Sequence, residues 1–242
     1  MSRHMLLSID AYECVFIERR NRFVGLVSID DSLVDVHITN TGRLSELLVR
    51  GRPCISYRIK GSRLSYRLAG IRVNGGYAVV DTILQSRAFE KALEDGMLPW
   101  LEGCSVASKN PRVGDSLLDY KLSCPWGDVY IELKSAVLIG PNREAMYPDC
   151  PTLRGQRHIR QLIAMTKAGL KAMLVMVAGF PNARCFKPYK QGDPLVYELI
   201  AEAYASGVDV KAISISMDNS GDIWLENPDL PLCGEWIREA VK

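Results

Sequence analysis

The spacing of apolar residues changes near residue 82, and this change constrains the fold more than any other feature of the sequence. Before it, short apolar or alternating stretches are separated by brief polar turns, as in β structure. After it, segments with helical spacing alternate with short apolar runs. A chain of 242 residues is long enough for two modest domains. We therefore expect one domain over residues 1–81 and a second over residues 82–242.

The first segment is expected to form a small β-barrel of the OB type. Five or six short strands in about 70 residues are typical of such a barrel. The expected strands are Tyr12–Glu18, Phe23–Ile29, Leu33–Thr39, Cys54–Ile59, Leu64–Val73 and Tyr77–Val80. One short helix is expected at Leu44–Val49, because Gly51 follows as a stop signal.

The second segment is expected to be an α/β domain with a mixed sheet. Thr82-x-x-Gln85 fits a capping box, and Gly96 fits a helix stop. Helices that alternate with strands indicate an α/β domain. The further expected elements are helices at Thr152–Lys167 and Pro194–Ala205 and strands at Ala172–Val177, Val210–Met217 and Asp222–Leu225.

Charge is unevenly distributed along the chain. The formal net charge is only +2, but residues 1–80 carry 12 Arg and Lys against 7 Asp and Glu, a balance of +5. The remainder therefore carries −3. Two interpretations stay open, namely a solvated basic surface or a polyanion-binding module joined to a more acidic catalytic one.

Composition indicates the cellular setting. Seven scattered cysteines without a C-x-x-C pair are typical of reduced thiols, although a hyperthermophilic source would allow disulfides. The longest apolar run is too short to span a bilayer, and the first residues lack a secretory signal pattern. We therefore expect a cytoplasmic protein without a membrane partner.

A hairpin with three charged side chains is the strongest chemical signal. The stretch Cys124-Pro125-Trp126-Gly127 has the Pro and Gly positions of a type I turn. If Cys124 pairs with Gly127, Asp119 faces Glu132, and Lys134 projects from the same face as Glu132. Two carboxylates are hard oxygen ligands for Mg²⁺ or Mn²⁺, and a lysine stabilises developing negative charge, which suits metal-dependent phosphodiester hydrolysis. The alternative is a solvated ion pair on an exposed strand face.

The helix after this hairpin has a polar stripe. At 100° per residue, Arg154, His158 and Gln161 lie on one side, with Arg157 at the edge, apart from an apolar stripe. Such side chains can hold phosphates through charge-assisted hydrogen bonds. The alternatives are a solvated helix face and, for His158, a packing role.

Two motif blocks resemble the sugar fermentation stimulation protein (SfsA) family. They are Glu132-Leu133-Lys134 and Tyr147-Pro148-Asp149 with Thr152–Arg160, against an approximate family pattern of E-V-K … F-P-D … T-x-R-G-x-K-H-L. The stretches RRNRFVGLV, VHITNTGRL and VVDTILQSRAFEKAL are similar to other parts of that pattern. The resemblance implies an N-terminal OB-like domain followed by a PD-(D/E)xK nuclease-like domain. It also implies binding of DNA or RNA and metal-dependent nuclease chemistry.

The resemblance assigns roles to individual residues. It makes Asp119 and Glu132 metal ligands for Mg²⁺ or Mn²⁺, Lys134 the catalytic lysine, and Glu90 a further ligand or base. The remaining contacts with nucleic acid are expected from Arg22, Asn40, Thr41, Arg43, Arg154, Arg157 and His158. Glu90 has the alternative reading of a surface residue, and the loop of Asn40 to Arg43 that of a plain turn. The chain departs from the family pattern at Leu117, Ser86 and Gln161.

Two functions stay open on the sequence. The first is a DNA or RNA nuclease, a metal-dependent phosphodiester hydrolase. The second is a non-catalytic DNA-binding regulatory protein linked to sugar metabolism, which the basic first segment and its interleaved aromatic residues favour. The sequence leaves open whether the chain forms a homo-oligomer.

Overall fold

The computed structural model describes residues 3–61 and 63–240, which form two compact units. The first unit is built from Met1–Lys91, Gly179–Asn182 and Ser214–Asn227. The second unit is built from Ala92–Ala178, Ala183–Ile213 and Pro228–Lys242. The first unit thus includes two segments from much later in the chain. The domain limits 1–81 and 82–242 stay a prediction.

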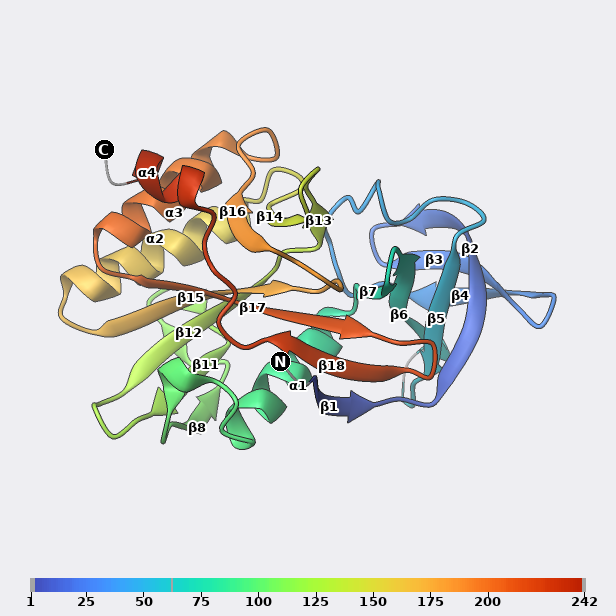
Figure 1. The fold of residues 1–242 in the computed structure, drawn as a ribbon, viewed down its shortest axis with the longest axis horizontal. Helices are drawn as coiled ribbons and strands as arrows, with labels where there is room; N and C mark the ends of the chain where they lie inside the picture. The colour runs from blue at the N-terminus through green and yellow to red at the C-terminus, as the bar shows by residue number, and fades with distance from the viewer. Residues whose placement is uncertain (1–2, 62, 241–242) are drawn as a thin grey trace. The chain divides into compact units, whose positions relative to one another are not determined.

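A closed five-stranded barrel forms the body of the first unit (Figure 1). Its strands are β2 (Ala11–Asn21), β3 (Val24–Ile29), β4 (Ser32–His37), β5 (Pro53–Arg58) and β6 (Tyr66–Val73). They follow the order β4-β3-β2-β5-β6, and a parallel pairing of Val36 with Tyr66 closes the ring between β4 and β6. Phe16, Val27 and Leu68 fill the interior and are at most 1% exposed. The expected OB-like barrel is confirmed.

The other strands of the first unit extend from this barrel. β7 (Gly76–Val79) pairs with β6, and the tip of their hairpin needs glycine because Gly75 has a φ of 95°. β18 (Asp222–Asn227) pairs with the end of β17 (Asp209–Met217) and with β1 (His4–Ser8), a strand that was not predicted from the sequence.

The start of α1 (Thr82–Glu94) differs from the predicted capping box. Asp81, not Thr82, caps this helix, and its Oδ1 accepts a hydrogen bond from the Ile83 N–H at 2.9 Å. The side chain of Gln85 donates to the Val79 carbonyl at 2.7 Å. The buried Asp81 occupies the N-cap position because it directly precedes the first residue of the helix, where its carboxylate can accept a hydrogen bond from the first turn.

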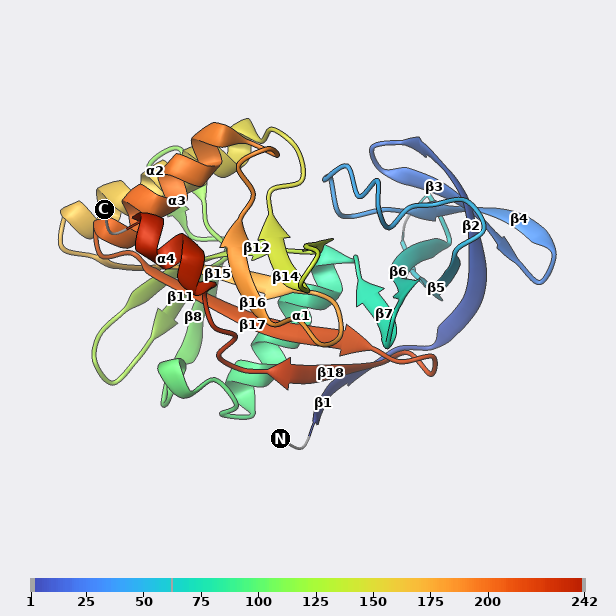
Figure 2. The ribbon, with the colours of Figure 1, turned by 45° about the horizontal axis from the view of Figure 1, so that its top comes forward.

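A mixed sheet with helices on one face forms the second unit. Its strand order is β17-β15-β12-β11-β8, where β15 is Lys171–Ala178, β12 is Val129–Ser135, β11 is Tyr120–Ser123 and β8 is Ser105–Lys109. β12 runs parallel to β15 and antiparallel to β11. Figures 1 and 2 show α2 (Leu153–Lys167) and α3 (Pro194–Ala205) side by side on one face of this sheet. The expected mixed α/β domain is confirmed.

Smaller elements complete the second unit. A three-stranded sheet has the order β13-β14-β16, with β14 parallel to β16. Among the described residues no helix is both long and apolar enough to cross a membrane. The small elements are β13 (Leu138–Ile139), β14 (Glu144–Tyr147), β16 (Cys185–Pro188), the hairpin of β9 (Arg112–Val113) and β10 (Ser116–Leu117), the 3₁₀ helix Pro99–Leu101 and α4 (Gly234–Ala240).

Two further expectations are wrong. The segment Leu44–Val49 is a series of turns, because Leu44 has a φ of 52° and the side chain of Arg52 binds carbonyl groups that a helix would use. Disulfides join Cys104 to Cys124 and Cys185 to Cys233, so these four thiols are not reduced. The folded chain brings each pair to Cα separations of 4.1 and 5.1 Å, which their spacing in sequence did not reveal.

Candidate active site

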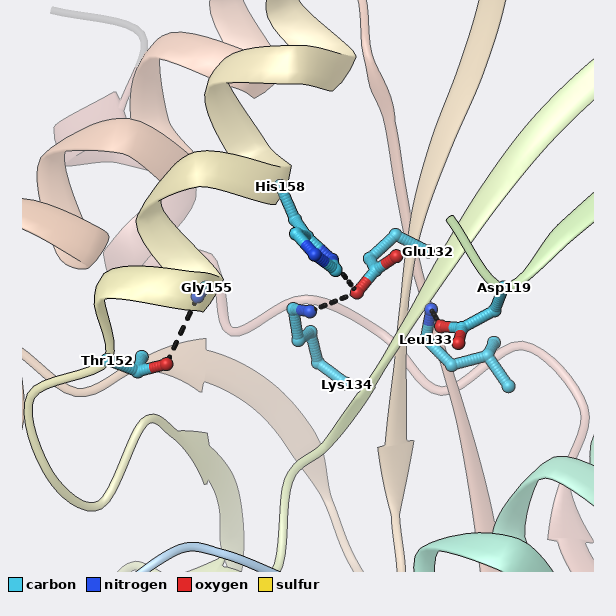
Figure 3. Close-up of polar contacts among 7 residues, drawn as sticks. All are labelled: Asp119, Glu132, Leu133, Lys134, Thr152, Gly155 and His158. Atoms are coloured by element: carbon cyan, nitrogen blue, oxygen red, sulfur yellow. Dashed lines mark hydrogen bonds and ion pairs between the residues drawn. The ribbon is translucent and has the colours of Figure 1, made fainter. Parts of the chain in front are cut away.

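The β11–β12 hairpin has the register predicted from its turn. The Gly127 N–H donates to the Cys124 carbonyl at 3.0 Å, and Tyr120 lies opposite Ile131. Asp119 directly precedes β11, and its Oδ2 accepts a hydrogen bond of 2.7 Å from the Leu133 N–H (Figure 3). The hairpin therefore holds the Asp119 carboxylate beside the strand that carries Glu132 and Lys134.

These charges are buried rather than solvated. Glu132 is 2% exposed, and the side chain of Lys134 is 11% exposed. Helix α2 lies over the face of β12 that carries the charges (Figure 3). This burial excludes the alternative of a solvated ion pair on an exposed strand face.

The two carboxylate oxygens of Glu132 have different surroundings. The Lys134 ammonium and Nδ1 of His158, which projects from α2, both contact Oε1 (Figure 3). Because an ionised carboxylate only accepts hydrogen bonds, Nδ1 of His158 carries the proton in this contact. Within the part of the chain that the structure describes, Oε2 of Glu132 is buried and has no hydrogen-bond partner. An unsatisfied buried carboxylate oxygen is costly, so this atom marks a place for a cation or a water.

The two carboxyl groups have pKa values shifted in opposite directions. Burial, followed by the charge of Glu132, raises the pKa of Asp119 to about 6, against the opposing effects of Lys134 and the Leu133 N–H. Burial by itself would raise the pKa of Glu132, but Lys134 and His158 outweigh it and hold that pKa below its usual range. Glu132 is therefore the permanent anion of the pair.

The N-termini of α2 and α3 are tied to one carboxylate. Thr152 caps α2, and its Oγ1 accepts a hydrogen bond from the Gly155 N–H at 3.1 Å (Figure 3). Asp193 caps α3 and also accepts hydrogen bonds from the Thr152 N–H at 3.0 Å and from the Gln156 side chain at 2.9 Å. This arrangement fixes the first turns of α2 and thereby the position of His158.

The residues expected to contact phosphates on α2 do not share one surface. Arg154 and Arg157 are exposed, whereas His158 is 2% exposed and faces Glu132. His158 therefore belongs to the carboxylate site and the two arginines to the surface, and phosphate binding by these residues stays a prediction. Glu90 is half-buried on α1 in the first unit, and its role as ligand or base stays a prediction.

The expected contact residues of the first unit are gathered around one arginine. The guanidinium of Arg19 donates to the carbonyls of Arg22, Asn40, Gly42 and Arg43 at distances between 2.6 and 3.1 Å. Thr41 and the side chains of Arg22 and Arg43 are exposed, whereas Asn40 is buried and its Oδ1 accepts from the Gly42 N–H. Arg19 was not among the residues predicted from the sequence, although the basic run in which it stands was the available signal.

The three departures from the family pattern have ordinary environments. Leu117 is 45% exposed on β10. The hydroxyl of Ser86 donates to the Thr82 carbonyl at 3.0 Å. Gln161 is half-buried on α2, close to where a side chain on Gly114 would lie.

Asp119 and Glu132 suit a hard divalent cation. Their oxygens are the ligands that Mg²⁺ and similar ions prefer, and Oε2 of Glu132 is unsatisfied. Within residues 3–61 and 63–240, no group of three or more His, Cys, Asp or Glu side chains is arranged to hold a metal. A cation at this pair would therefore complete its coordination with water or substrate, as Mg²⁺ usually does.

Comparison with known proteins identifies the family. The model described as "Sugar fermentation stimulation protein RE domain" matches residues 83–221, and the model described as "SfsA N-terminal OB domain" matches residues 17–80. The chain belongs to the SfsA family. The expected OB-like barrel followed by an α/β domain with a mixed sheet is confirmed, and the likeness of the second domain to PD-(D/E)xK nucleases stays a prediction.

Relatives in this family match almost the whole chain. The sugar fermentation stimulation protein homolog of Pyrococcus furiosus is 47% identical over 212 residues, which are 88% of this chain and 92% of the relative. The homolog of Archaeoglobus fulgidus is 42% identical over 223 residues, 91% of this chain and 95% of the relative. The solved structure of Pyrococcus furiosus SfsA in complex with Ca²⁺ superimposes with a TM-score of 0.92 at 43% identity, covering 95% of this chain and 99% of that one.

Proposed function

We propose that this SfsA-family chain binds nucleic acid and hydrolyses phosphodiester bonds with a divalent cation held by Asp119 and Glu132. The observation that carries the proposal is the unsatisfied Oε2 of Glu132, buried beside a second carboxyl group. The Ca²⁺ complex of the Pyrococcus furiosus relative supports a cation site in this fold. For this chain we propose Mg²⁺ or Mn²⁺ as the working ion.

The side chains around Glu132 hold its carboxylate in one orientation and leave Oε2 available to a cation. Lys134 and His158 both contact Oε1, so the carboxylate cannot rotate without losing charge-assisted contacts. This restraint keeps Oε2 directed away from both donors. When bound, Mg²⁺ or Mn²⁺ would lower the pKa of a bound water and offset the charge of the phosphate.

Lys134 supplies the positive charge of the reaction. Its ammonium stands next to Glu132 in a buried site, where a charge acts more strongly than in water. In the hydrolysis, the oxygen of a water molecule bonds to phosphorus, the bond from phosphorus to the leaving sugar oxygen breaks, and a proton moves to that oxygen. The ammonium stabilises the negative charge that develops on the phosphate oxygens during this exchange.

Exposed basic residues in each unit are proposed to bind the phosphate backbone. In the first unit these are Arg22 and Arg43, with the Thr41 hydroxyl, on the loops that Arg19 holds. In the second unit they are Arg154 and Arg157. Such contacts are independent of base sequence, so we propose that DNA and RNA are both candidate substrates.

A cleavage assay tests the catalytic proposal. Labelled single-stranded and double-stranded DNA and RNA are incubated with the protein in Mg²⁺, Mn²⁺ or chelator. Lys134→Ala is expected to lower kcat by roughly 10² to 10³, and Glu132→Gln is expected to abolish metal-dependent cleavage. Lys167→Ala, an exposed position on the same helix as His158, is the matched control. If Lys134→Ala cleaves as fast as the unmodified chain, the assignment of this lysine is wrong.

An aromatic cluster on the barrel favours a second candidate, a non-catalytic DNA-binding regulator. The rings of Tyr12 and Tyr66 lie 5.3 Å apart edge to face, and the Arg58 guanidinium lies 5.3 and 5.6 Å from their centroids. Aromatic and guanidinium faces on such barrels stack with bases. If the protein binds nucleic acid in chelator with an affinity that falls with salt, and cleaves none in the presence of any metal ion, this candidate is favoured over the nuclease.

A further inference from the structure

The turn between β2 and β3 presents an aromatic ring to solvent, and the contacts proposed so far do not use it. Phe23 lies in this turn and is 50% exposed, whereas Phe16 and Leu68 of the same barrel are at most 1% exposed. One exposed apolar residue is ordinary on a protein surface. The meaning of Phe23 therefore depends on what surrounds it.

The backbone of Phe23 is fixed on both sides. Its N–H donates a hydrogen bond to Oδ1 of Asn21 at 2.9 Å, and its carbonyl accepts one from the Ile38 N–H at 2.8 Å. A phenylalanine side chain has only two rotatable bonds, so a fixed backbone leaves the ring few positions. A ligand that covers this ring therefore has little side-chain entropy to overcome.

One guanidinium joins this turn to a second loop of the same unit. Arg19 donates to the carbonyl of Arg22, in the turn, at 2.8 Å. It also donates to the carbonyls of Gly42 and Arg43, in the loop that follows β4, at 2.6 and 2.9 Å. The ring of Phe23 is therefore held on a turn that is tied to the loop carrying Arg43.

Positive charge is concentrated around the ring. Residues 19–23 and 40–43 contain four arginines and no acidic residue. Arg20 is in an ion pair of 2.8 Å with Asp35, whereas the side chains of Arg22 and Arg43 are exposed. The guanidinium carbon of Arg22 lies 5.8 Å from the centroid of the Phe23 ring. These charges favour a polyanion as the partner of the ring over a purely apolar protein surface.

We propose that Phe23 stacks against an unpaired base of a single-stranded nucleic acid, whose flanking phosphates bind Arg22 and Arg43. The inference rests on the proposed nucleic-acid binding and adds to it a residue and a class of substrate. Every base has a flat face that can stack on an aromatic ring, whatever the sequence. In a duplex the neighbouring bases cover these faces, so the ring distinguishes single strands from duplexes, which phosphate contacts alone do not.

Phe23→Leu in the full chain tests the inference, because it removes the aromatic face and keeps an apolar side chain. Affinity is measured by fluorescence anisotropy in chelator, so that no strand is cut, for labelled oligothymidylate and for a duplex of equal length. Single-strand binding should weaken roughly 5- to 50-fold, the range expected for one stacked base. The dependence of affinity on salt should stay the same, because the phosphate contacts remain. Duplex affinity should stay within about twofold of that of the unmodified chain.

A fluorescent base reports stacking directly. A single 2-aminopurine in the oligothymidylate loses fluorescence when it stacks, so binding to the unmodified chain should quench it and binding to the Phe23→Leu chain should not. Phe23→Trp, which keeps an aromatic face, should bind and quench like the unmodified chain. Leu33→Ala is the matched control, because it removes an apolar side chain that is 66% exposed on β4 of the same barrel. All these variants change exposed side chains, so their Tm should stay close to that of the unmodified chain.

The outcomes separate this inference from the proposed hydrolysis. A Phe23→Leu chain that binds single strands like the Leu33→Ala control, or that loses single-strand and duplex binding equally, overturns the stacking role. If the unmodified chain binds neither strand form, nucleic-acid binding and the role of Phe23 are both wrong. If it binds but cleaves with no metal ion, only the hydrolysis is wrong, and the affinities still decide the role of Phe23.

Discussion

Asp193 provides the most direct test of how this fold supports the candidate site. The residue is 3% exposed and accepts four hydrogen bonds. Two come from the Leu195 and Val196 N–H groups at the start of α3, at 3.1 and 3.2 Å. The other two come from the Thr152 N–H and the Gln156 side chain of the α2 region. Asp193→Ala removes all four acceptor contacts at once.

The expected loss of stability follows from these contacts. Loss of an N-cap costs about 1 kcal/mol, and each of the two bonds to the α2 region adds about 1.5 kcal/mol because the acceptor is charged. The free energy of unfolding should therefore fall by about 4 kcal/mol, a large part of a typical domain stability. Asp193→Asn keeps an N-cap oxygen but loses the charge and one acceptor, so about half of that loss is expected.

Urea unfolding at pH 7 measures this difference. The midpoint should fall with little change in slope, and hydrogen exchange should accelerate in α2 and α3 together. Glu198→Ala, an exposed change on α3, is the control and should shift the free energy by less than about 0.5 kcal/mol. A loss below about 1 kcal/mol for Asp193→Ala, or faster exchange in α3 alone, would refute the view that one carboxylate holds both helices.

Three further outcomes are expected. His158→Ala should weaken binding of the proposed Mn²⁺ ion roughly 10- to 100-fold by calorimetry, because Glu132 loses a partner that orients it; unchanged affinity would contradict this role. Burial alone would raise the pKa of Glu144, but hydrogen bonds from Lys187 and the neighbouring backbone outweigh this effect and lower the pKa to about 2. The ionised Glu144 side chain therefore stabilises the folded chain above the pKa that this residue has in the unfolded chain. This contribution is lost as the pH falls from about 5 to 2. Glu144→Gln should therefore lower stability at pH 7 by up to about 3 kcal/mol but leave it nearly unchanged at pH 2, and equal losses at both pH values would disprove the assignment. Arg43→Ala should weaken nucleic-acid binding equally for all sequences and reduce the salt dependence by about one counterion, and a sequence-selective loss would argue against a phosphate contact.

Local signals were sufficient for much of the fold. The Cys124–Gly127 turn predicted the register of the β11–β12 hairpin, because a short turn leaves few pairings open. Pro194 and Ala205 marked the limits of α3, and Thr152 marked the start of α2. In each case the residues that carried the signal belong to the predicted element or lie directly beside it in the sequence.

Predictions were wrong or incomplete where a residue outside the recognised pattern competed with it. Leu44–Val49 has a helix-like pattern, but Arg52 binds its carbonyls instead. Thr82 fits a capping position that the buried Asp81 takes. His158 shares helical spacing with exposed arginines, yet it faces Glu132 because α2 packs over β12.

The sequence by itself determined which side chains share a strand face or a helix turn, and therefore that Asp119, Glu132 and Lys134 would stand together. Only the tertiary structure decided that these charges are buried, that Oε2 of Glu132 has no hydrogen-bond partner among the described residues, and that His158 contacts the same carboxylate. The reason is physical. The backbone repeats of strands and helices set neighbours along the chain, whereas burial and hydrogen-bond partners depend on which distant segments pack together.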